Sequence, residues 1–297
     1  ATLLQEALAD MDPRLKPSRA GILHARLAEY QSEAGDSKAA LATYEEASRL
    51  VADEPASAEK ARVLAGHGSE LMRQGQYSAS RSLCEQAIAV ARAVGARAEE
   101  GRALNTLGCD LSGLGDPEAG IATLRQALPI SEAAGDFDDI YCVYLNLSTV
   151  LGLEAGRPHE AAQVTRQGLE RMRMLGVELA VPGRMLRSSL AWLLWDLGRW
   201  QEAEELVSEE LIRGLPAAWG LSLRLLSGRL HLAHGRLDLA SEEGETAARM
   251  VEPLDSLSHS CLHAYLAELA MAHADYPSAR SAVAKALEHL ADSEDQT

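Results

Sequence analysis

Several guanidinium, amide, hydroxyl, thiol and indole side chains recur at similar distances before regularly spaced glycines, and these groups could bind a ligand. Together they supply fixed hydrogen bonds and apolar area, which is the mixture that a small-molecule or peptide groove needs. The candidate ligand-binding residues are Arg62, Ser69, Arg102, Asn105, Cys109, Asn146, Ser188, Trp192 and Arg229. Cys142, Met185 and Trp195 are expected near the same face. The alternative is that this set is an ordinary solvated surface with part of the core.

Two histidine pairs have the spacing of metal ligands on a helix. His259 and His263 are four residues apart, and His231 and His234 are three residues apart. No matching carboxylate or thiolate pattern accompanies them, so we expect no bound metal and no cofactor. His231 and His263 are instead expected to pack between helices.

Catalytic motifs are missing from the sequence. It contains no G-x-S-x-G, no H-E-x-x-H and no Gly-Lys dipeptide, so the hydrolase, metalloprotease and P-loop patterns are excluded. Cys109 and Cys142 could approach each other across neighbouring units, but nothing near them in the sequence would depress a thiol pKa. The chain is therefore predicted not to be an enzyme, which leaves enzymatic activity as the least favoured alternative.

Trp192 and Trp195 are three residues apart on one expected helix, and Trp200 follows the next turn. Such a cluster usually packs in a core. The functional alternative is a stacking platform for a sugar ring or a proline-rich segment.

The elements that position these residues follow from a repeat of about 40 residues. One place in each unit is taken by Gly35, Gly75, Gly115, Gly156, Gly198, Gly235 and Ala274. A second series falls about 20 residues later, at Gly95, Gly135 and Gly176, with Pro55 in the first unit. Two interleaved series with one spacing are hard to obtain by chance.

Between these positions the apolar residues follow a period near 3.6, as in Leu104, Leu107 and Leu111. Each unit is therefore predicted to be two antiparallel helices. The glycine ends the first helix in a left-handed conformation, and Asp, Pro or Arg then starts the turn into the second. The fourth unit carries one extra residue before Gly156.

Small residues recur where helix backbones must approach each other. They lie seven residues before the turn or five residues after it, at Gly68, Gly108, Ala191, Gly228, Ala267, Ala40, Ala203, Ala240 and Ala279. A larger side chain at these places would cost about 1–3 kcal/mol. Ser80 and Gly120 depart from the pattern, because alanine is expected at both.

This pattern resembles the tetratricopeptide repeat, whose usual period is 34 residues. The resemblance covers essentially the whole chain and implies an all-α, right-handed superhelix of about seven helical hairpins, forming one domain over residues 1–297. Ligands of this fold usually lie in the concave groove lined by the first helix of each hairpin. Residues 1–12 are predicted to be the second helix of a preceding repeat, so the chain is expected to be a fragment of a longer protein.

Composition and charge limit the classes of fold and binding partner that fit this chain. The chain is 47% apolar, has one Phe, and carries a net charge of −16 with no basic segment, which disfavours an all-β fold and direct contact with nucleic acid or an anionic membrane. No apolar run of transmembrane length and no leader is present, and the four cysteines are scattered, so a cytoplasmic location is expected. The acidic runs are expected on a solvated outer helix face, and they comprise Glu202, Glu204, Glu205, Glu209 and Glu210.

Three segments, residues 105–128, 133–161 and 197–206, carry a narrower resemblance. They are similar to the superhelical middle region of large LuxR-type ATP-binding transcription regulators, an architecture shared with the maltose-regulon activator. In that family a signal-transduction NTPase precedes the repeats and a helix-turn-helix follows them. The resemblance implies that this region senses a small-molecule inducer or a protein or peptide partner and relays binding to the NTPase and DNA-binding domains.

The leading hypothesis is therefore a non-enzymatic sensor and interaction domain of a cytoplasmic transcription regulator. The alternative is a scaffold that holds a peptide or protein subunit and takes no small-molecule inducer. A homo-oligomer is also an open expectation, since a cut through a hairpin at the N-terminus would leave an apolar face uncovered.

Overall fold

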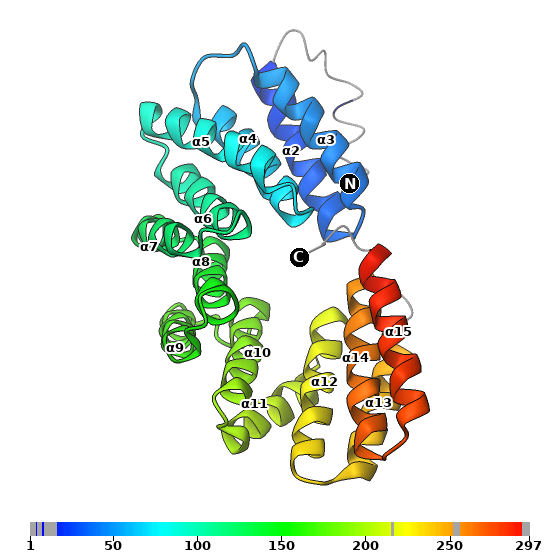
Figure 1. Ribbon diagram of the computed structural model, residues 1–297. Coiled ribbons are helices and arrows are strands. Elements are labelled where there is room, and N and C mark those ends of the chain that lie inside the picture. Colours follow the sequence, from blue (N-terminus) through cyan, green and yellow to red (C-terminus); the bar gives the residue numbers. More distant parts are fainter. Residues whose placement is uncertain (1–3, 5–7, 9–16, 215–216, 252–255, 293–297) are drawn as a thin grey trace. The chain divides into compact units, whose positions relative to one another are not determined.

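The computed structural model describes residues 4, 8, 17–214, 217–251 and 256–292, and every regular element within them is a helix (Figure 1). The predicted all-α fold of tetratricopeptide-like hairpins is confirmed. The second helix expected over residues 1–12 lies, apart from Leu4 and Leu8, outside the described residues.

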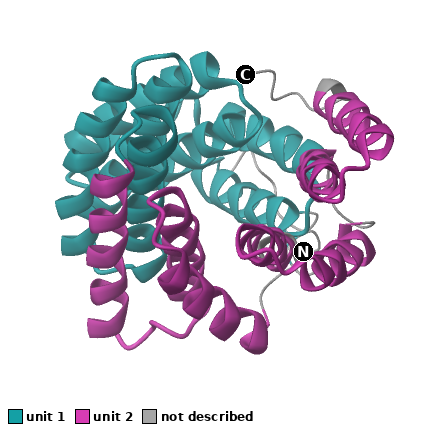
Figure 2. Ribbon diagram, turned by 60° about the horizontal axis from the view of Figure 1, so that its bottom comes forward, with its two compact units in different colours: residues 1–157 teal, residues 158–297 magenta. Residues whose placement is uncertain are grey.

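Long-range contacts divide the chain into two compact units, residues 1–157 and residues 158–297 (Figure 2). The boundary between the two units falls at the turn of the fourth hairpin. The sequence predicts instead one continuous array over residues 1–297. Repeats contact only their neighbours, so a continuous array can also be divided in this way, and the single domain stays a prediction.

The first unit contains three complete hairpins and the first helix of the fourth. Its helices are α2 (Pro17–Glu33), α3 (Ser37–Val51), α4 (Ala58–Arg73), α5 (Tyr77–Val94), α6 (Arg97–Gly113), α7 (Pro117–Ala134) and α8 (Phe137–Thr149), followed by the π-helical turn η1 (Val150–Glu154). The first helices α2, α4, α6 and α8 contact one another in that order, and each also packs against the second helix of its own or the preceding hairpin. This stacking places four first helices side by side.

The second unit continues the pattern with the remaining second helix and three more hairpins. Its helices are α9 (Pro158–Met174), α10 (Val181–Asp196), α11 (Trp200–Arg213), α12 (Ala217–Ala233), α13 (Leu237–Val251), α14 (Ser256–Ala272) and α15 (Tyr276–Asp292). Here too the first helices α10, α12 and α14 contact in sequence. Among the described helices, none combines the length and the apolarity that a bilayer-spanning segment requires.

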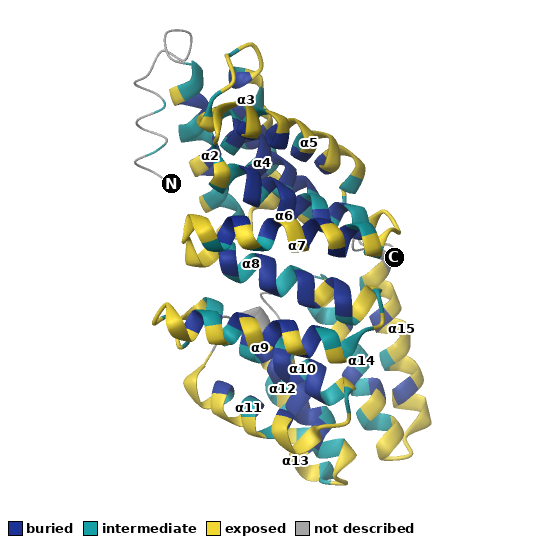
Figure 3. Cartoon of the chain, turned by 90° about the vertical axis from the view of Figure 1, so that its left-hand side faces the viewer, coloured by how far each residue is buried: buried dark blue, intermediate teal, exposed yellow. Residues whose placement is uncertain are grey.

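The buried residues form a core between the two helix layers of each unit (Figure 3). One cluster joins α4 through α8 and includes Leu64, Ile88, Leu104 and Val143. A second cluster joins α2, α3 and α4, and a third joins α12, α13 and α14. Each cluster draws on consecutive hairpins, so the packing of one repeat depends on the next.

The turn glycines adopt the predicted left-handed conformation. At Gly115, for example, φ is +91°, the N–H of Asp116 donates to the carbonyl of Leu111 at 2.9 Å, and the Asp116 carboxylate accepts from the N–H of Ala119 at 3.0 Å. The glycine thus ends the first helix, and the aspartate caps the second.

Ala274 is the residue that replaces glycine in the last hairpin, and it adopts φ +59°. An alanine in the left-handed conformation costs about 1–2 kcal/mol. Replacing it by glycine removes this strain, but glycine loses more conformational entropy on folding, which offsets part of the gain. We expect Ala274→Gly to stabilise the last hairpin by about 0.5–1 kcal/mol, measured by chemical denaturation or by hydrogen exchange in α14 and α15. The matched variant Ala270→Gly, within α14, should destabilise it by a similar amount. Stabilisation by both variants, or by neither, would contradict this explanation.

The small residues lie where the helices touch most closely, as predicted. A Cβ added to Gly108 would lie 2.5 Å from Cγ of Leu124, and one added to Gly228 would lie 2.2 Å from the Tyr265 hydroxyl. Ala40, Ala203 and Ala240 are fully buried, with Ala279 5% exposed. The Gly108 contact sets the distance between the two helices of a hairpin, α6 and α7, and the Gly228 contact sets the distance between the first helices of neighbouring hairpins, α12 and α14.

Both departures from the pattern have a structural cause. A Cβ on Gly120 would lie 2.6 Å from the Gly108 carbonyl oxygen, so the expected alanine does not fit there. At Ser80 the hydroxyl lies 2.8 Å from the Gly68 carbonyl oxygen and 2.7 Å from Oδ2 of Asp110, which is fully buried on α6. The serine therefore provides a polar partner for a buried carboxyl group.

The extra residue of the fourth unit is absorbed by η1. The N–H of Ala155 donates to the carbonyl of Val150 at 2.9 Å, the wider bond of a π-helical turn, so one residue is added without rotating the preceding part of α8. The bulge also brings Glu154 into a hydrogen bond with the Ser112 hydroxyl on α6. The turn at Gly156 thereby keeps its place in the repeat.

Candidate functional site

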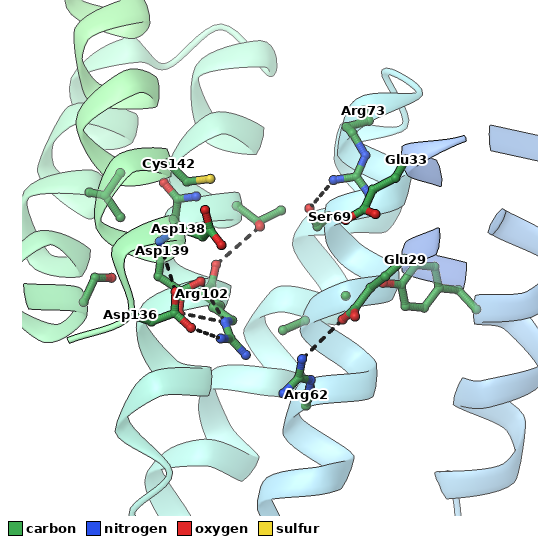
Figure 4. Close-up of a pocket in the computed structure, with 17 residues that line it drawn as sticks. Glu29, Glu33, Arg62, Ser69, Arg73, Arg102, Asp136, Asp138, Asp139 and Cys142 are labelled. Atoms are coloured by element: carbon green, nitrogen blue, oxygen red, sulfur yellow. Dashed lines mark hydrogen bonds and ion pairs between the residues drawn. The ribbon is translucent and has the colours of Figure 1, made fainter. Parts of the chain in front are cut away.

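A pocket of about 430 Å³ opens among the four first helices of the first unit. It is lined mainly by polar side chains, and Figure 4 shows their arrangement. The lining residues are Glu29, Glu33, Tyr44, Arg62, Ala65, Gly66, Ser69, Arg73, Arg102, Asn105, Thr106, Ser131, Asp136, Asp138, Asp139, Cys142 and Val143. Four of the nine candidate residues, Arg62, Ser69, Arg102 and Asn105, therefore share one pocket.

Arg102 interacts with three carboxylates around this pocket. Its Nε lies 2.8 Å from both carboxylate oxygens of Asp139, and its terminal nitrogens lie 3.1 Å from Glu99 and 3.4 Å from Asp136. Burial opposes the charge of Arg102, but the hydrogen bonds and negative charges of Asp139, Glu99 and Asp136 outweigh it and raise the pKa of the guanidinium. Arg102 thus ties α6 to the start of α8.

The other two arginines are held on α4. Arg73 donates to the fully buried carboxylate of Glu70 at 2.6 Å and to the Ser69 hydroxyl at 2.9 Å. Arg62 is 3.5 Å from the Glu29 carboxylate, a looser contact. Each guanidinium in the pocket therefore already faces at least one carboxylate.

Two carboxylates of the pocket have no such partner among the described residues. Glu33, in the last turn of α2, and Asp138, in the first turn of α8, both have side chains without a hydrogen bond or ion pair there. Burial, together with the negative charges of Asp136, Asp139 and Glu33, raises the pKa of Asp138. The lining therefore carries an excess of negative charge.

A buried hydroxyl completes the lining. Ser131, on α7, is 2% exposed, and its Oγ has no hydrogen-bond partner in the described part of the chain. Gly101 leaves space beside it, because a Cβ at that position would lie 3.0 Å from the hydroxyl. An unsatisfied buried hydroxyl in a pocket is a ready hydrogen-bond donor or acceptor for a ligand.

Cys109 and Asn146 do not line the pocket but lie beside it. The Asn146 amide donates to the Asn105 side-chain oxygen at 3.1 Å, which joins equivalent positions of neighbouring units. Burial raises the pKa of Cys109 and of Cys142 to about 12, so both remain protonated at neutral pH and are poor nucleophiles. Their part in binding stays a prediction.

Sequence reasoning missed the acidic wall of the pocket. Glu29 stands six residues before Gly35, the same place that Ser69 takes before Gly75, so the repeat register could have identified it. Asp136, Asp138 and Asp139 follow the second-series glycine Gly135, and the signal was three acidic residues within one helical turn. Their approach to Arg102 depends on packing between units.

The remaining three candidates lie in the second unit. Ser188 is 2% exposed and donates to the Arg184 carbonyl of its own helix, which places it in the core and not on an open face. Trp192 and Arg229 do meet: the guanidinium lies 5.4 Å from the indole centroid, while the indole N–H donates to the Ser222 hydroxyl at 2.9 Å. Arg229 is also paired with Glu268 at 2.8 Å.

The tryptophan cluster is only partly assembled. Trp195 and Trp200 stack with ring centroids 5.5 Å apart, and Trp200 meets the His234 ring edge-on. Trp192 has separate partners on α12. Trp192 and Trp195 are partly buried and Trp200 is exposed, so the cluster lies at the edge of the core.

The histidines on α14 stack against another histidine. His259 and His263 both face His289 on α15, with ring centroids 5.0 and 5.5 Å apart. Burial, Lys285 and the two other histidines lower the pKa of His263. Across the described residues, no group of three or more His, Cys, Asp or Glu side chains is arranged to hold a metal ion.

The prediction that the acidic residues of α11 form a uniformly solvated face is wrong for one of them. Glu202, Glu205 and Glu209 are exposed and Glu204 is partly exposed, but Glu210 is 1% exposed. Its two carboxylate oxygens each accept a hydrogen bond at 2.7 Å, from Arg184 and from Arg187 of α10. The position of Glu210 on the helix turns it towards the neighbouring helix.

The sequence profile of the tetratricopeptide repeat matches residues 59–133, which span α4 to α7 and much of the pocket. The hairpins outside this stretch share their turn geometry and small-residue contacts. No curated protein sequence matches the chain.

Solved structures of tetratricopeptide-like proteins resemble the whole chain. A Rap protein complexed with competence and sporulation factor has a TM-score of 0.69 at 14% identity, covering 99% of this chain and 79% of that chain. The Rap conjugation gene regulator of plasmid pLS20, in complex with the Phr* peptide, has a TM-score of 0.65 at 14% identity, covering 95% and 77%. The apo form of the quorum sensor NprR from B. thuringiensis has a TM-score of 0.64 at 10% identity, covering 97% and 92%. At these identities the likeness concerns the fold.

Proposed function

We propose that the first unit is a recognition module that binds a peptide segment in its pocket, without catalysis. The observation that carries the proposal is that helices α2, α4, α6 and α8 each contribute polar side chains to one cavity. Such an arrangement offers hydrogen-bonding groups along the stack of repeats, which suits an extended chain.

Similar folds support this choice of ligand. Two of the similar structures are described as complexes with competence and sporulation factor and with the Phr* peptide, and a third as a quorum sensor. In this chain Ser69 and Asn105 lie on adjacent first helices and could contact a bound peptide backbone.

We propose further that this module belongs to a transcription regulator. The resemblance to the middle region of LuxR-type regulators supports a flanking NTPase and a helix-turn-helix in the parent chain. Binding would favour one arrangement of the stacked hairpins, and that shift in population would be passed to the NTPase.

A small-molecule inducer is the second candidate ligand. The cavity volume of about 430 Å³ lies within the range of small-ligand sites. The lining is strongly charged, however, whereas small-molecule sites are mostly apolar. The peptide is therefore the better-supported ligand.

The test is a screen of N-acetylated decapeptides against the 297-residue chain by fluorescence anisotropy. Any peptide that binds should bind about threefold to tenfold more weakly to Ser69→Ala and Asn105→Ala, because each variant removes a hydrogen-bonding group from the pocket. Gln86→Ala, an exposed position on α5, is the control and should leave binding unchanged.

Unchanged affinity in both pocket variants would refute the site. Absence of any binding peptide, together with a thermal shift by a metabolite that the same two variants abolish, would replace the peptide with a small-molecule inducer.

A further inference from the structure

The pocket of the first unit has more negative than positive charge, and its arginines are already occupied. Five carboxylates line it, from Glu29, Glu33, Asp136, Asp138 and Asp139, against three guanidiniums. The two strongest arginine contacts are internal, from Arg102 to Asp139 and from Arg73 to the buried Glu70, both at 2.8 Å or less. A negatively charged ligand would have to displace these carboxylates before it could use the arginines.

Glu33 and Asp138 are left for a ligand. Both side chains line the pocket without a partner in the described part of the chain, and Figure 4 shows them on opposite walls. Glu33 lies at the C-terminal end of α2, where the helix dipole disfavours a negative charge, and the last turn of α2 contains no basic residue. A cation placed between the two walls would relieve both charges.

The hydroxyl of Ser131 gives a second, independent indication of a ligand. It is 2% exposed, it lines the same pocket, and its Oγ has no partner among the described residues. Leaving a buried hydroxyl unsatisfied is unfavourable, and an ammonium or guanidinium N–H donor would satisfy it.

We propose that this pocket selects a basic side chain, arginine or lysine, of the bound peptide, with Glu33 and Asp138 providing the negative charge that recognises it. The inference rests on the proposed peptide-binding function and names the residue type that the peptide must carry. Glu33 and Asp138 are both exposed, so a charge pair with the peptide there adds specificity more than affinity. A neutral residue of the same shape is therefore the appropriate comparison.

The experiment compares two fluorescent pools of N-acetylated, C-amidated hexapeptides, one with arginine and one with citrulline at a fixed position. Citrulline keeps the shape of arginine and removes the charge. We expect the arginine pool to bind the 297-residue chain about tenfold more tightly at low salt, with the preference decreasing as salt is added.

Variants of the two carboxylates test whether they cause the preference for arginine over citrulline. Glu33→Gln and Asp138→Asn should each reduce the arginine-to-citrulline ratio about threefold or more, while the affinity for the citrulline pool stays the same. The control Glu59→Gln, an exposed carboxylate of α4 outside the pocket lining, should leave the ratio unchanged. Both pocket variants replace exposed side chains that have no hydrogen bond or ion pair with any described residue, so folding should be unaffected.

The outcomes separate the two proposals. Equal binding of both pools would overturn the selection of a basic side chain while leaving peptide binding intact. Absence of binding by either pool would overturn peptide binding itself. Binding of free spermidine that depends on Glu33 and Asp138, in the absence of peptide binding, would assign the charge to a polyamine and overturn the proposal.

Discussion

Glu210→Ala is expected to lower the free energy of unfolding of the second unit by about 3–5 kcal/mol. Glu210 is 1% exposed and accepts hydrogen bonds at 2.7 Å from Arg184 and Arg187, whose side chains are only 12% and 14% exposed. Removing the carboxylate leaves two largely buried guanidiniums without their central counter-charge, which is costlier than losing a surface ion pair.

The neighbouring Glu209 provides the control. It also pairs with Arg187 and with Arg213, but its side chain is 53% exposed, so water can replace the interaction and Glu209→Ala should change stability far less. All four tryptophans of the chain lie beyond residue 157, so tryptophan fluorescence during urea denaturation reports the second unit specifically. Equal effects of the two variants would show that burial of Glu210 does not determine the cost.

Raising the pH from about 5 to about 9 should destabilise the first unit by about 3 kcal/mol through Asp110. Burial raises the pKa of Asp110 from 3.8 to about 7, although the hydrogen bonds of Ser80 and Cys84 act in the opposite direction. The folded state therefore binds a proton that the unfolded state has lost. The resulting stability is fully present below about pH 4 and disappears as the pH rises through 7.

Hydrogen bonding explains why the protonated form fits. A protonated Asp110 can donate to the Ser80 hydroxyl, which then donates to the Gly68 carbonyl oxygen 2.8 Å away. Ionisation leaves a fully buried charge, and Oδ1 has no partner among the described residues.

Asp110→Asn is the matched variant, since it keeps the shape and removes the charge. It should be more stable than the wild type at about pH 9, with a flatter pH dependence, measured by hydrogen exchange in α4 to α6. An unchanged pH dependence in this variant would assign the effect to another group.

The repeat itself could be predicted because its signals are local. A glycine with positive φ ends a helix through bonds within a few residues, and a period near 3.6 defines a buried face within one helix. The turns at Gly35 through Ala274, the small residues at Gly68 and Gly108, and the added residue before Gly156 were all identified from spacing and are confirmed. Even Ala274, which lacks glycine's freedom, adopts the conformation that its place requires.

The candidate site was predictable only in part, because exposure depends on neighbouring hairpins. Asn105 and Ser188 each stand ten residues before their turn glycine, yet Asn105 lines a pocket and Ser188 is buried. Adjacent Glu209 and Glu210 are likewise alike in sequence and opposite in burial.

The sequence by itself determined where helices begin, end and approach each other, since those properties depend on residues close along the chain. Only the tertiary structure decided that Asp139 meets Arg102, that Glu33 and Asp138 line one pocket, and that Asp110 is buried beside Ser80. These groups are about 30 residues or more apart, and stacking of whole repeats brings them together. Their electrostatic environment arises from that stacking and is absent from any single helix.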